Sequence, residues 1–135
     1  MRPLFARLHT MQAWTIFAGC FVLIYLIALS VFGGASSATH GTAGRLLFLA
    51  ALGLPTMALI ARGSRLTIGL SVLVPLLFLL QGVFVYLPIF PPIIRALHAL
   101  NGLVIMGLCY QLANGRARVA RPQPPVAVAG QHSAD

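Results

Sequence analysis

The chain has 135 residues, of which 59% are hydrophobic and only 7% are charged, and its mean hydropathy is +0.95. A soluble domain of this size would carry about a quarter charged residues, so the composition indicates an integral membrane protein. All nine basic residues are arginine and the only acid is Asp135, which gives a net charge of +8. No basic face with interleaved aromatic residues is present in the sequence, so the charge indicates anionic lipid headgroups rather than nucleic acid as the partner.

Four apolar runs are long enough to cross a bilayer, which requires about 20 residues. Their expected bounds are 12–32, 40–61, 66–87 and 93–112. Each must be helical in hydrocarbon, and the short links favour antiparallel neighbours. The predicted fold class is therefore all-α, an integral membrane antiparallel four-helix bundle with up-down-up-down topology over residues 1–115. Residues 116–135 are rich in proline and alanine, and we expect them to form a disordered cytoplasmic tail.

The first run has some features of a signal peptide, because Arg2 and Arg7 precede it and small residues follow it. Its apolar stretch is longer than the roughly 7–15 residues of a signal h-region, so we interpret it as a retained helix. Pro55 and Pro75 fall inside the second and third spans and are expected to kink them.

The arginines are distributed unequally between the two sides of the predicted bundle. One side carries Arg2, Arg7, Arg62, Arg65, Arg116, Arg118 and Arg121. The other side carries only Arg45 and Arg95. Because arginine is enriched in cytoplasmic loops, the sequence predicts a multi-pass protein of the bacterial inner membrane with both termini cytoplasmic. His40 and His98, near the starts of spans two and four, are then expected on the outer side.

A layer of polar residues is expected in the outer half of the bundle. His98 lies about two turns inside span four, and Gln81 on span three and Tyr25 on span one fall at nearly the same depth when each residue rises about 1.5 Å. Asn101 lies one turn deeper. A strongly polar residue within a span indicates a functional site by default.

Two histidines in this region share a local pattern that suits a flat metal macrocycle. Gly44 follows His40 and Gly102 follows His98, each at i+4 and therefore on the same helix face. Imidazole is a good ligand for haem iron, and a glycine one turn away leaves room for the porphyrin. The pattern predicts haem b between helices two and four, with both histidines as metal ligands.

The two haem propionates would require cations, and the outer side offers two. Arg95 lies three residues before His98 on the same face and is the first candidate; Arg45, five residues after His40, is a poorer angular match. Gln81 is interpreted either as a hydrogen-bond donor at the site or as an interhelical packing residue. Depth argues against a symmetric site, because His40 lies about 9 Å further out than His98 when counted from the cytoplasmic ends.

The alternatives to the ligand hypothesis remain open. A lone histidine in a span often serves as a hydrogen-bonding residue between helices, and glycine is common in membrane helices because it permits close packing. His40 could equally be a loop residue near the headgroups. His9 and His132 lie in terminal segments and are interpreted as solvated.

The segments "ATHGTAGRLLFLAALG", "LLFLLQGVFVYLP" and "LHALNGLVIMGL" together resemble a family of small four-helix bacterial membrane proteins of unassigned function, over roughly residues 12–115. The layout is also similar to one half of haem A synthase and to other four-helix b-type cytochromes. In those families histidines on the second and fourth helices ligate haem, which implies His40 and His98 as the axial pair. The chain departs from haem A synthase in having one four-helix unit and no membrane-embedded glutamate, so the resemblance does not imply synthase activity.

The leading hypothesis is a membrane b-type cytochrome with one haem near the outer face, working as an electron-transfer or quinone-linked oxidoreductase component. One haem at that depth cannot bridge the membrane, so a quinone or a redox partner protein is expected. The alternatives are a cofactor-free accessory or scaffold subunit, as a homo-oligomer or in a larger complex, and a chlorophyll-type pigment-binding protein. Proton-coupled transporters and cation channels rely on intramembrane acids, which the four spans lack.

Overall fold

The computed structural model describes residues 1–115, which are helical and contain no strand. Four helical segments within this range are long and apolar enough to cross a membrane, as the sequence predicts. They are α1 (Arg2–Val31), α2 (Ser37–Ala51) continued by α3 (Gly53–Ile60), α4 (Arg65–Tyr86), and α5 (Pro92–Arg95) continued by α6 (Leu97–Asn114). The predicted disordered tail, 116–135, lies outside the described residues.

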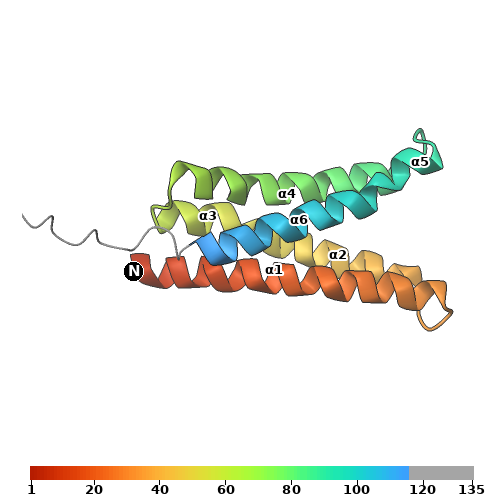
Figure 1. The fold of residues 1–135 in the computed structure, drawn as a ribbon, viewed down its shortest axis with the longest axis horizontal. Helices are drawn as coiled ribbons and strands as arrows, with labels where there is room; N and C mark the ends of the chain where they lie inside the picture. The colour runs from red at the N-terminus through yellow and green to blue at the C-terminus, as the bar shows by residue number, and fades with distance from the viewer. Residues whose placement is uncertain (116–135) are drawn as a thin grey trace, which may run out of the picture.

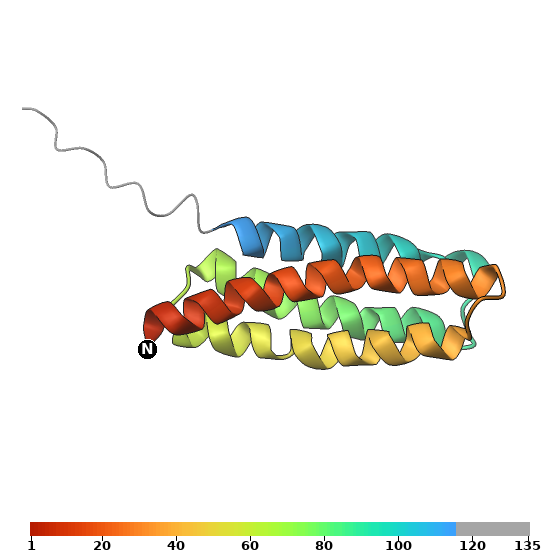
Figure 2. The same ribbon diagram turned by 90° about the horizontal axis from the view of Figure 1, so that it is seen from below.

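The four segments lie side by side along the long axis of the molecule (Figures 1 and 2). The loop between α1 and α2 lies at one end together with α5, and we call this the cavity end because a cavity lies toward it. The N-terminus and the turn between α3 and α4 lie at the opposite end, which we call the N-terminal end. α1 packs closely along α6 and α2, and α4 packs along α6, whereas α2 and α4 contact one another less.

The first helix is longer than the sequence analysis predicts. It begins at Arg2, ten residues before the expected start, with Pro3 in its first turn. Proline suits this position because its fixed φ is helical and its missing N–H has no intrahelical partner there. The strictly apolar run begins later than the helix because an α-helix needs no continuous apolar sequence outside the bilayer.

Span two is broken into α2 and α3 at Leu52, three residues before Pro55. Proline has no N–H to continue the helical ladder. Gln12 of α1 covers the break, where its Nε2 donates a hydrogen bond to the carbonyl of Ala50. A Cβ added to Gly53 would lie 2.7 Å from this Nε2, so glycine makes room for the contact. By contrast, α4 continues as one helix through Pro75.

His9 is buried, which corrects the interpretation of this residue as solvated. Its side chain is only 5% exposed, and its Nε2 lies 2.8 Å from the Oγ of Ser71 on α4. Ser71 Oγ donates to the carbonyl of Thr67 at 2.7 Å, so it accepts from His9. Because α1 already begins at Arg2, His9 falls on its inward stripe, together with Ala13, Ile16 and Cys20.

Candidate functional site

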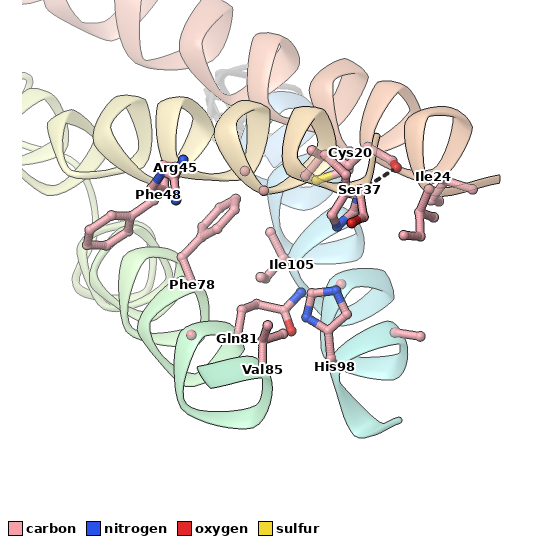
Figure 3. A pocket seen from close by; sticks show the side chains of 18 of the residues that line it. Cys20, Ile24, Ser37, Arg45, Phe48, Phe78, Gln81, Val85, His98 and Ile105 are labelled. Carbon is pink, nitrogen blue, oxygen red and sulfur yellow. Dashed lines mark hydrogen bonds between the residues drawn. The ribbon is translucent and has the colours of Figure 1, made fainter. Parts of the chain in front are cut away.

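A cavity of about 1110 Å³ lies toward the cavity end of the bundle and is lined by α1, α2, α4 and α6 (Figure 3). Pockets for small molecules and cofactors typically measure about 300–1,000 Å³, so this volume suits a large ligand. Most of the wall is apolar. Phe48 of α2 and Phe78 of α4 lie on it with their ring centroids 6.4 Å apart.

The two predicted histidine ligands meet at this cavity. The ring centroids of His40 and His98 are 5.9 Å apart with the rings tilted by 69°, and both side chains line the cavity. The expected difference of about 9 Å in depth does not keep the rings apart. Two features reduce it, since α6 continues to Asn114, two residues past the expected end, and span two is interrupted at Leu52.

Both histidines lie in the first turn of a helix. Ser36 caps α2 by accepting a hydrogen bond from the N–H of Ala38, as serine commonly does at a helix N-terminus, and His40 lies on the first turn. The short α5 ends at Arg95, and α6 begins at Leu97, so His98 is the second residue of α6.

The hydrogen bonding of the two imidazoles differs. His40 Nδ1 lies 2.9 Å from the carbonyl oxygen of Leu23 on α1. A carbonyl only accepts, so Nδ1–H donates and the lone pair is on Nε2. Histidines that ligate metals usually donate their other ring N–H in this way. His98 Nδ1 is buried and has no hydrogen-bond partner, and the same is true of the amide oxygen of Gln81.

Glycines widen the cavity beside the histidines. Gly44 lines it, and a Cβ added there would meet nothing within 4 Å. A Cβ added to Gly102 would lie 3.4 Å from Gln81 Nε2. Two lining glycines were missed by the sequence analysis, Gly41 and Gly82. Each directly follows a predicted site residue, and this adjacency was an available signal.

The two candidate arginines occupy different places. Arg45 lines the cavity, and its Nη2 donates to Thr42 Oγ1 at 3.0 Å. Arg95 does not line the cavity and donates from its Nη2 to the carbonyl of Val85 at 3.1 Å, near the end of α4. The order of the two candidates from the sequence, with Arg95 first, is therefore the reverse of their placement at the cavity.

Two other predicted site residues lie off the cavity. Tyr25 is 63% exposed and is not a lining residue. Asn101 is buried, and its Nδ2 donates to the carbonyl of Leu77 on α4 at 2.8 Å, which joins α6 to α4 outside the cavity wall. Tyr86, which the sequence analysis did not select, does line the cavity; it lies four residues after Gly82 and so on the same helix face.

The donor set of the site is the imidazole pair. Within residues 1–115 no group of three or more His, Cys, Asp or Glu side chains gathers to hold a metal ion. Cys20 lines the cavity as a free thiol. Comparisons with protein-family models, with curated proteins and with solved structures find no match to this chain.

Proposed function

We propose that this chain is an integral membrane protein of the bacterial inner membrane, an antiparallel bundle of up-down-up-down topology with both termini cytoplasmic. Many large apolar side chains on the outer surface of the helices support membrane insertion, among them Leu46 at 63% exposed and Leu49 at 61%. Lipid is a suitable environment for such a surface, because helices satisfy their backbone groups internally. Among the described residues, four arginines belong to the N-terminal end, and this excess over the other end supports the orientation; they are Arg2, Arg7, Arg62 and Arg65.

A reporter fused after Asp135 tests the orientation. The fusion is expected to be active only as a cytoplasmic reporter, and a second reporter inserted at Gly34, in the α1–α2 loop, only as a periplasmic one. Periplasmic activity after Asp135 would overturn the assignment of sides.

Within this bundle the chain binds one haem b between α2 and α6 and serves as an electron-transfer protein. The observation that carries this proposal is the pair of imidazoles 5.9 Å apart, centroid to centroid, at a cavity of about 1110 Å³. Metal–nitrogen distances are about 2.0 Å, so two imidazoles that hold one metal ion must lie close together. His40 and His98 would be the two residues that hold the iron of the haem.

The residues at the site fit the group in three ways. His40 offers Nε2, since its Nδ1–H donates to Leu23. Gly44 leaves open space that any larger residue would occupy. Arg45 is a lining cation, and no acid in residues 1–115 is available to neutralise it, so it suits a propionate. A bound haem b would supply one-electron chemistry by cycling between ferric and ferrous iron.

The protein's own part in this function is to hold and insulate the group. The Leu23 carbonyl fixes the ring of His40, and hydrogen bonds of this kind also make the ligating nitrogen more basic. The apolar wall formed by residues such as Phe48 and Phe78 limits water at the centre of the bundle. Because the site lies near one end of the bundle, electrons must be exchanged with a partner protein or a lipid-soluble carrier such as a quinone.

An absorption spectrum of the purified full-length protein tests the function. A Soret band with sharp α and β bands on reduction is expected for low-spin haem b. A far-red band would identify a chlorin pigment instead. No visible chromophore after expression with ample haem would overturn the cytochrome and favour a cofactor-free subunit of a larger complex.

A further inference from the structure

Two polar atoms beside the cavity are buried without a partner, and they belong to neighbouring side chains. They are Nδ1 of His98 and Oε1 of Gln81. Figure 3 shows the amide of Gln81, on α4, pointing toward the ring of His98, on α6. A buried polar group without a hydrogen bond costs free energy, so two such groups side by side call for a shared explanation.

One tautomer of His98 would give both unpaired atoms a hydrogen-bond partner. If Nδ1 carries the proton, it can donate to the amide oxygen of Gln81, and a single hydrogen bond then satisfies both atoms. If Nε2 carries the proton, Nδ1 has only a lone pair and cannot pair with an oxygen. A small change in the last torsion of Gln81 is sufficient, because the terminal torsions of glutamine are broad.

We propose that Gln81 is a positioning residue that accepts a hydrogen bond from His98 Nδ1–H and so presents the Nε2 lone pair of His98 to the cavity. The role toward a metal rests on the proposed haem site. The arrangement would reproduce that of His40, whose Nδ1–H donates to an oxygen of a neighbouring helix. One ring is thus held by a backbone carbonyl of α1 and the other by a side-chain amide of α4.

The competing arrangement is a flipped amide, in which the Gln81 nitrogen donates to His98 Nδ1. Oxygen and nitrogen of an amide are assigned from their hydrogen bonds, so this alternative must be tested. It would place the proton of His98 on Nε2 and remove the lone pair that faces the cavity. The two arrangements therefore predict opposite tautomers in the protein without haem.

The first experiment uses nitrogen NMR of histidine-labelled, full-length protein in lipid nanodiscs without haem. The wild type is expected to show His98 as the Nδ1–H tautomer. Gln81→Met keeps the side-chain length but has no strong acceptor, and is expected to give a mixture of tautomers. Gln81→Glu restores an acceptor and is expected to restore Nδ1–H. In Gln12→Met, a control at a half-buried glutamine of the N-terminal end, the tautomer of His98 is expected to remain unchanged.

The result for His40 is an internal control, since its partner is the Leu23 backbone and its tautomer is expected to stay the same in every variant. A wild-type His98 in the Nε2–H form would overturn the inference in favour of the flipped amide. An unchanged Nδ1–H form in Gln81→Met would also overturn it, because the glutamine would then not set the tautomer.

The second experiment separates this inference from the proposed haem site. A hydrogen bond from Nδ1–H makes the imidazole a stronger donor, which favours ferric iron. In haem-loaded protein, Gln81→Met is therefore expected to raise the reduction potential, and Gln81→Glu to reverse the change. If the wild type binds no haem, the haem proposal fails while the tautomer result stands. If haem binds and neither potential nor tautomer changes in Gln81→Met, the positioning role fails alone.

Discussion

The two ends of the bundle each contain a histidine with a buried ring nitrogen, but its surroundings differ. At the N-terminal end, His9 is paired with Ser71, which is itself bonded to Thr67. At the cavity end, His98 lies against a cavity of about 1110 Å³ with its Nδ1 unpaired. The histidine at the N-terminal end is therefore hydrogen-bonded within the protein, whereas the histidine at the cavity end has a buried nitrogen without a hydrogen-bond partner.

A structural histidine can be separated from a candidate ligand by what lies next to its polar atoms. The core next to His9 is well packed, with Ile16, Leu54 and Val74 fully buried. His9 and Ser71 are paired with one another there, although the Oε1 of Gln12, one turn along α1, has no partner. The polar groups at the cavity end, His98 and Gln81, retain unused hydrogen-bonding capacity beside empty space. A buried polar group is normally satisfied. The unpaired atoms of His98 and Gln81 differ from that of Gln12 in belonging to side chains that line a cavity, which supports the ligand proposed there.

The largest expected effect comes from removing each histidine in turn. His98→Ala is expected to abolish haem retention, since an axial ligand is lost from the site. His9→Ala, the matched change at the other end, is expected to keep the wild-type low-spin spectrum and to lower only the stability. The spectra of the two variants, purified in parallel, provide the measurement.

His40→Ala extends this test to the second ligand. With one imidazole remaining, at most a five-coordinate, high-spin haem is expected. Retention of the wild-type low-spin spectrum by both His98→Ala and His40→Ala would contradict the bis-histidine site. Loss of haem in His9→Ala, with folding intact, would show that the two ends are not as distinct as their packing suggests.

A smaller effect is expected from filling the cavity at Gly44. A Cβ on either Gly44 or Gly107 would meet nothing within 4 Å, but only Gly44 lines the cavity. Gly44→Leu is expected to weaken haem binding by roughly five- to 150-fold, because intruding side chains cost about 1–3 kcal/mol. Gly107→Leu should leave binding unchanged. Haem titration of the two variants measures this, and equal affinities would place the macrocycle elsewhere.

Much of the fold was predictable because it depends on local sequence. Four apolar runs in a chain with so few charges can hardly be other than four helices, and five of their eight expected ends lie one residue from the observed ones. The start of α1 was missed since residues before Met11 are mixed in character, and apolarity marks the bilayer rather than the helix. The structure describes these helices but not residues 116–135, so the tail remains a prediction.

The candidate site was predictable only in its residue types. The pattern of glycine four residues after histidine selected His40 and His98, and the structure places both at one cavity. The places of Arg95 and Tyr25 depend on helix rotation, which a single sequence with weak amphipathicity does not define. The burial of His9 depends on its partner Ser71, 62 residues away, and no local pattern reports such a contact.

A third prediction tests whether the hydrogen bond between His9 and Ser71 stabilises the N-terminal end without affecting the cavity. Ser71→Ala removes the hydroxyl that accepts from His9, and it is expected to lower the free energy of unfolding by about 1–2 kcal/mol, the usual cost of leaving a buried polar group without that bond. The haem spectrum should not change. Unfolding in a denaturing detergent series measures the stability, with Ser30→Ala, at a partly exposed serine of α1, as the control. A shifted haem spectrum in Ser71→Ala would contradict the separation of the two ends.

The smallest expected effect concerns the two arginines, and it tests which of them lies closer to the proposed haem. Arg45 lines the cavity, whereas Arg95 donates to the Val85 carbonyl outside it. A positive charge beside the haem favours the reduced state, which carries one less positive charge at the iron. Arg45→Gln is therefore expected to lower the reduction potential. A partly exposed charge pair is worth up to about 1 kcal/mol, and a tenfold change in a one-electron equilibrium is about 59 mV, so the shift should be on the order of tens of millivolts.

Arg95→Gln should shift the reduction potential less, because the side chain of Arg95 points to a carbonyl of α4. Redox titration of both variants decides between them. A larger shift in Arg95→Gln would place the propionates at the end of the bundle, beside the short helix α5. Arg95 would then be the first candidate, as the sequence alone favours.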